Sequence, residues 1–135
     1  MKIQIVLILI MCQFLNAGCR AQDQKSVIDL LTKYKWETVV NNNVPGSSVC
    51  EIYSRDSVFC HINNGARQFD VALPYYISQT PDTVFDRNKI GKNDDGIYIV
   101  TENMPTLKII EITGKKMKVL TETYHVILEF TAKPK

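Results

Sequence analysis

The sequence predicts a small all-β domain whose strands form an antiparallel sandwich or barrel. From Trp36 onward, apolar residues recur at every second position in short runs, which is the pattern of half-buried strands. Clusters of Gly, Pro, Asn and Asp separate these runs, and together they give about eight or nine short strands. The sequence shows no internal repeat, and its length of 135 residues fits one domain.

The segment before the first strand predicts a short helix. Ser26 is placed to cap a helix over residues 27–33, with Asp29 at the third helical position. Apolar residues at helical spacing support this helix: Val27, Leu30, Leu31 and Tyr34. The period then changes to two in the first strand, which begins near Trp36, and the turn residues of 41–46 end it.

Residues 48–54 and 57–62 predict a hairpin that carries two cysteines. A three-residue loop centred on Arg55 places Cys50 opposite Cys60, so the sequence predicts a disulfide between them. Two buried free thiols are the alternative. The predicted face also contains Ile52, Val58 and Ile62. A register slip of one residue would put the two thiols on opposite faces of the sheet.

The later segments alternate in the same way and end at turn residues. We expect Pro74 to stop a strand over residues 67–73, with Tyr75–Ile77 as a further strand or a packed loop. The remaining strands are expected over residues 83–85, 97–101, 107–112, 116–122 and 125–132.

The N-terminus predicts export. Lys2 and the apolar run of residues 3–15 form a secretory signal, and a run of about 13 residues is too short to span a membrane. We divide the chain into a signal peptide (1–18), a tether (19–25) and a β-barrel domain (26–135).

The residues before Cys19 are similar to a bacterial lipobox, in which small residues precede a lipidated cysteine. Lipidation of Cys19 would anchor the protein to a membrane of the cell envelope. Cleavage after Ala21, which would give a soluble periplasmic or secreted protein, is the alternative.

Composition and motifs argue against several functional classes. The net charge is only +2 and the Lys and Arg residues are dispersed, so we expect no nucleic-acid partner. His61 and His125 lie in different predicted strands, and the cysteines lack metal-binding spacing, so we expect no metal and no cofactor. The sequence has no nucleophile elbow, P-loop or dinucleotide fingerprint, which predicts a protein that is not an enzyme.

Four features together resemble a known family. A short helix runs into a strand with a single Trp over Leu30–Trp36, and Tyr75–Ser78 is followed by Asp82–Asp86. Gly96–Val100 and Leu107–Met117 complete the pattern. The chain thus resembles the lipocalin-like lipoproteins of Bacteroides-type bacteria. This resemblance implies an eight-stranded up-and-down barrel with a helix covering one end, whose interior binds a small hydrophobic or amphipathic ligand.

The expected ligand-binding residues are aromatic. Trp36 would close the bottom of the barrel, Tyr75 and Tyr76 would border its mouth, and Tyr98 would add to the lining. The alternative is an envelope interaction module with a solid core and no ligand. A cavity smaller than a few hundred cubic ångströms would favour that alternative.

Overall fold

Eight antiparallel strands form a closed barrel in the computed structural model, which describes residues 26–39 and 47–135. Each strand pairs with its neighbours in sequence, and β8 closes the barrel against β1. The prediction of a small antiparallel barrel with a short N-terminal helix is confirmed. The elements in chain order are α2 (Val27–Lys33), β1 (Lys35–Val39), β2 (Ser48–Tyr53), β3 (Ser57–Asn63), β4 (Gln68–Ser78), the 3₁₀ helix η1 (Arg87–Lys89), β5 (Tyr98–Thr101), β6 (Leu107–Ile112), β7 (Lys116–Thr121) and β8 (Ile127–Lys133).

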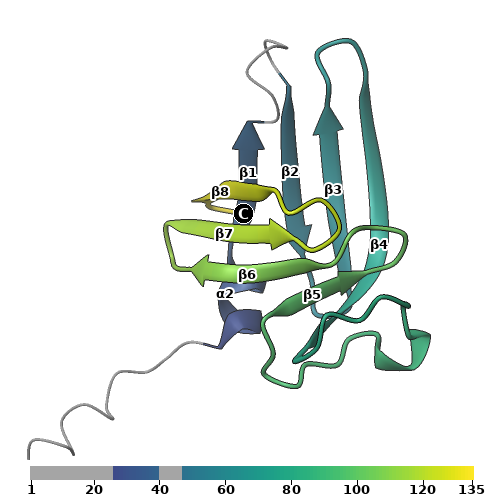
Figure 1. The fold of residues 1–135 in the computed structure, drawn as a ribbon. Coiled ribbons are helices and arrows are strands. Elements are labelled where there is room, and N and C mark those ends of the chain that lie inside the picture. The colour runs from purple at the N-terminus through teal and green to yellow at the C-terminus, as the bar shows by residue number, and fades with distance from the viewer. Residues whose placement is uncertain (1–25, 40–46) are drawn as a thin grey trace, which may run out of the picture.

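The barrel consists of two groups of strands that cross one another (Figure 1). Strands β1–β4 run lengthwise in this view, and β5–β8 run across them. β4 belongs to both groups, because it pairs with β3 as far as Pro74 and with β5 from Tyr75 onward. The carbonyl of Pro74 accepts a hydrogen bond from the Glu102 amide, one residue past β5.

Pro74 therefore does not stop the strand, contrary to the sequence-based expectation. Proline has no backbone N–H to donate. Pro74 lies one residue before the first pair between β4 and β5, so the hydrogen bonds of that strand pair are kept. The strand expected over residues 83–85 is also absent. The segment between β4 and β5 contains η1, and an isolated bridge joins its Asn93 to Ile77 of β4.

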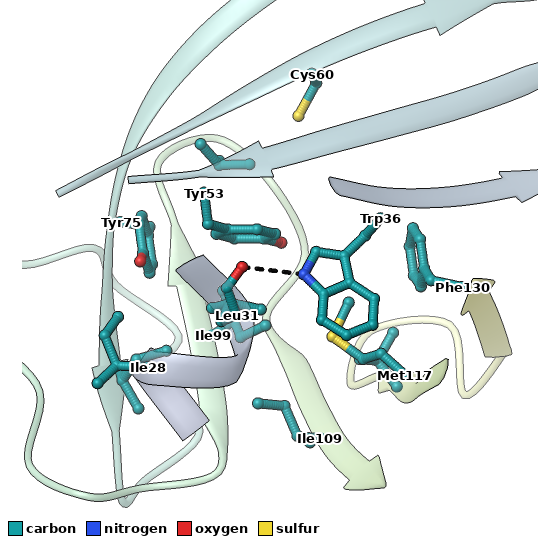
Figure 2. Close-up of a cluster of buried hydrophobic side chains, with 13 residues drawn as sticks. Ile28, Leu31, Trp36, Tyr53, Cys60, Tyr75, Ile99, Ile109, Met117 and Phe130 are labelled. Atoms are coloured by element: carbon teal, nitrogen blue, oxygen red, sulfur yellow. Dashed lines mark hydrogen bonds between the residues drawn. The ribbon is translucent and has the colours of Figure 1, made fainter. Parts of the chain in front are cut away.

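Helix α2 covers one end of the barrel. Its N-cap is Ser26, whose side chain accepts a hydrogen bond from the Asp29 amide at 3.3 Å, as the sequence predicts. Ile28 and Leu31 form its buried face. The indole N–H of Trp36 donates to the Leu31 carbonyl at 3.0 Å, which joins the end of the helix to β1 (Figure 2).

The core fills the interior next to this helix. The side chains of Leu31, Trp36, Ile99, Met117 and Val119 are each 0% exposed. Figure 2 shows Phe130 and Met117 beside the indole of Trp36. Together with Ile28 of the helix, these side chains form one closely packed hydrophobic cluster.

The turn between β2 and β3 is one residue shorter than predicted. The Ser54 amide donates to the Ser57 carbonyl at 2.8 Å, and the Ser54 hydroxyl accepts from the Ser57 amide at 3.1 Å. These bonds leave Arg55 and Asp56 as a two-residue turn. Tyr53 consequently lies opposite Val58, and every pair along the hairpin shifts by one position.

This register corrects the predicted disulfide between Cys50 and Cys60. Cys50 pairs with His61 on the outer face, whereas Cys60 pairs with Glu51 on the inner face. The two thiols lie on opposite sides of the sheet and are free. The same shift turns Glu51 and Tyr53 into the barrel and leaves Cys50 and Ile52 outside.

Candidate functional site

The barrel contains a cavity of about 160 Å³, part of whose wall is formed by the core residues Tyr53, Val58 and Cys60. Its wall comes from most of the strands and from the β5–β6 loop, and within the described chain α2 contributes no lining residue. Met104, in that loop, is 48% exposed and also lines the cavity, so the cavity reaches the surface beside it. The lining residues are Glu51, Tyr53, Val58, Cys60, Thr101, Met104, Pro105, Leu107, Thr121 and Leu128.

The wall of this cavity is mainly apolar but includes the carboxyl group of Glu51. This residue is 9% exposed. The Tyr53 hydroxyl donates to Glu51 Oε2 at 2.7 Å. No salt bridge to Glu51 forms among residues 26–39 and 47–135. Burial raises the pKa of Glu51, because the charged form loses its water, and the Tyr53 hydrogen bond opposes this rise only in part.

Tyr53 is held in place from its other side by Tyr75. Their rings meet edge to face, with centroids 5.2 Å apart. The Tyr75 hydroxyl donates to the Ser54 carbonyl at 2.6 Å, which fixes the Tyr75 ring against the β2–β3 turn. Figure 2 shows Tyr75 beside Tyr53 in the core. The hydroxyl that contacts Glu51 is therefore carried by a rigid aromatic pair.

Cys60 is the second titratable neighbour of Glu51 in the cavity. Burial raises the pKa of this thiol to about 12, and the nearby charge of Glu51 adds to the shift. Burial likewise raises the pKa of Tyr53 well above its usual value, with Glu51 adding to the effect. At neutral pH both groups keep their protons, so the Cys60 sulfur is not a nucleophilic thiolate.

The structure separates the four aromatic residues that the sequence predicts to bind a ligand. Trp36 and Tyr75 lie inside the barrel as core residues, 0% exposed, and neither lines the cavity. Tyr76 pairs with Val100, and both point to the outside of the barrel. Tyr98 shares this outer face, because successive side chains of β5 point to opposite faces and the neighbouring Ile99 lies in the core. The cavity residue Glu51 was missed, because the predicted register turned it outward.

Tyr76 is nonetheless buried, under the segment that connects β4 to β5. Its hydroxyl donates to Asp82 Oδ2 at 2.8 Å, and its ring lies 5.3 Å from that of Phe85. The Lys89 ammonium forms a salt bridge to the same Asp82 oxygen at 3.0 Å. These contacts hold the connecting segment against the outer wall of the barrel.

The remaining sequence-based expectations concern the N-terminal segments, metal binding and membrane spans. The signal peptide, the tether and Cys19 lie outside the described residues. Within the described part of the chain, no group of three or more His, Cys, Asp or Glu side chains is arranged to hold a metal. No helix in that part is long and apolar enough to cross a membrane.

We expect Glu51→Gln to stabilise the protein more at about pH 8 than at about pH 4. Because the folded-state pKa of Glu51 is raised, the folded protein binds this proton more tightly than the unfolded chain does. The wild-type protein therefore loses stability as the pH rises from the pKa of Glu51 in the unfolded chain to its higher pKa in the folded protein. Glutamine does not ionise, so the variant avoids this loss, and its side-chain oxygen still accepts the Tyr53 hydrogen bond. Urea denaturation at both pH values tests the prediction. An equal effect at both would contradict it.

Comparison with protein-family models, with curated proteins and with solved structures finds no match to this chain.

Proposed function

We propose that this chain is an exported, lipid-anchored barrel protein of the lipocalin-like kind, which binds a small amphipathic ligand in its interior. The observation that carries the proposal is the buried carboxyl group of Glu51 in the wall of a mainly apolar cavity. Apolar walls with a few fixed polar groups are the usual composition of small-molecule sites.

The volume of the cavity limits the size of the ligands that can bind in it. A cavity of about 150 Å³ in another protein accepts benzene. The cavity here has a similar volume, about 160 Å³, so it fits a single ring or a short branched chain. Long-chain lipids are too large for it.

Filling the cavity should abolish binding. In Leu128→Trp, the larger ring occupies the space that Leu128 now borders, so we expect binding of toluene to be lost. Ile127→Trp is the matched control, because Ile127 is the next residue of β8 and is 57% exposed. Ligand-observed NMR on the purified protein measures binding. Equal toluene binding by both variants would refute an interior site.

Export and anchoring rest on the N-terminal sequence, in which Ala17 and Gly18 precede Cys19. We expect the protein purified from membranes to have the mass of a chain that begins at an acylated Cys19. Cys19→Ser should move the protein to the soluble fraction. A wild-type mass that corresponds to cleavage after Ala21 without lipid would contradict the anchor.

A second function, an envelope interaction module without a ligand, is favoured by the small volume of the cavity. Pockets for drug-sized ligands measure about 300–1,000 Å³, well above the roughly 160 Å³ found here. The Leu128→Trp variant separates the two functions. A specific envelope partner that binds this variant as tightly as the wild type, together with no toluene binding by the wild type, would establish the module.

A further inference from the structure

Glu51 is an ionisable group whose charged form receives little stabilisation from the described residues around it. Among the described residues, the Tyr53 hydroxyl is its one side-chain hydrogen-bond donor, and no Lys or Arg forms a salt bridge with it. An ionised carboxylate can accept about four hydrogen bonds. A buried carboxylate with one donor and no cation is costly, so it stays neutral or finds a positive partner.

Within residues 26–39 and 47–135, the surroundings of Glu51 contain no such partner. On β2 and β3, the titratable groups that face it are Tyr53 and Cys60, which are neutral at neutral pH. Its neighbour across the ladder on β1 is the apolar Trp36. The cavity wall from β5 to β8 adds only uncharged side chains: Thr101, Met104, Pro105, Leu107, Thr121 and Leu128.

We infer that the cavity selects a small organic cation, a primary ammonium group on a compact apolar body, and that Glu51 is the residue that recognises the ammonium. This inference rests on the proposed interior site and specifies its ligand class. The ammonium supplies the donors and the positive charge that the carboxylate lacks, and burial strengthens the attraction between the two charges. The apolar body fills the space between Val58, Leu107 and Leu128.

The same geometry rejects other amphipathic ligands. A fatty acid or another carboxylate would place a second negative charge next to Glu51, which is unfavourable in an apolar cavity. A long alkyl chain exceeds the volume of about 160 Å³. The sign of the charge and the size of the apolar body together define the ligand class.

Binding of the ammonium should release a proton from Glu51. The empty site favours the neutral acid, whereas the ammonium favours the carboxylate. Affinity should therefore rise with pH through the titration of Glu51 and stop rising once that group is fully ionised. Calorimetry in two buffers with different ionisation heats, at a pH low enough for Glu51 of the free protein to hold its proton, measures the released proton directly.

Two probes of equal size test the inference on the purified protein. Benzylamine carries the ammonium, and ethylbenzene replaces it with a methyl group. We expect wild-type protein to bind benzylamine more tightly, and Glu51→Gln to weaken benzylamine binding about tenfold or more while leaving ethylbenzene binding unchanged. Glu129→Gln on the outer face of β8 is the control and should change neither affinity, since its side chain is 67% exposed.

The outcomes distinguish this inference from the proposed function. Ethylbenzene binding without a preference for benzylamine would leave the interior site intact and overturn the cation inference. Equal benzylamine affinity in wild type and Glu51→Gln, or no proton release, would also overturn it. If neither probe binds the wild-type protein, the interior site itself is wrong, and both proposals fail.

Discussion

Replacing Trp36 with alanine should lower the free energy of unfolding by about 3–5 kcal/mol. The indole is 0% exposed and packs between helix α2 and the barrel core, so its removal leaves a large void. It also leaves the Leu31 carbonyl without the hydrogen bond that the indole N–H now donates at 3.0 Å. Both losses act at the junction of α2 and β1.

Urea denaturation followed by far-UV circular dichroism measures this effect, because the substitution removes the only Trp fluorophore. Trp36→Phe is the matched variant, which keeps an aromatic ring but has no N–H group. It should lose about 1–3 kcal/mol, the cost of a smaller ring and an unpaired buried carbonyl. If Trp36→Ala costs less than about 1 kcal/mol, the indole does not hold the helix end together.

Much of the fold follows from local sequence patterns. The capping position of Ser26 and the apolar spacing after it predict the helix with the bounds that the structure gives. Alternating apolar residues predict most of the strands, and turn residues predict most of their ends. The expected stop at Pro74 fails, because a proline is tolerated where β4 passes from one partner strand to the other.

The candidate site was harder to predict, because it depends on the register of one hairpin. A three-residue turn at Arg55 would place Cys50 and Ile52 inside, which the apolar pattern favours. The hydrogen bonds between Ser54 and Ser57 set a two-residue turn instead, and Glu51 moves inside. The available signal was this pair of serines around the turn. Periodicity alone gives the alternation of faces but not which face is inner.

Replacing Gly96 with alanine should destabilise the protein by about 3 kcal/mol or more. A Cβ atom at this position would lie 1.9 Å from the Ser78 carbonyl oxygen and 2.4 Å from the Gln79 nitrogen. These are backbone atoms at the end of β4, and Ser78 pairs with Tyr98 in β5, so they cannot move without breaking the ladder. The connecting segment before β5 would have to leave the barrel wall.

Gly114→Ala is the matched control, because an added Cβ there would meet a side chain and no backbone atom. There the nearest atom is the Tyr34 hydroxyl oxygen at 3.0 Å, the far end of a side chain that can shift. We expect this variant to cost less than about 1 kcal/mol. In Gly96→Ala, release of the segment should also expose Tyr76, which now donates to Asp82. Quenching of tyrosine fluorescence reports this exposure. An unchanged Tyr76 environment together with wild-type stability would show that the close contact at Gly96 does not hold the segment.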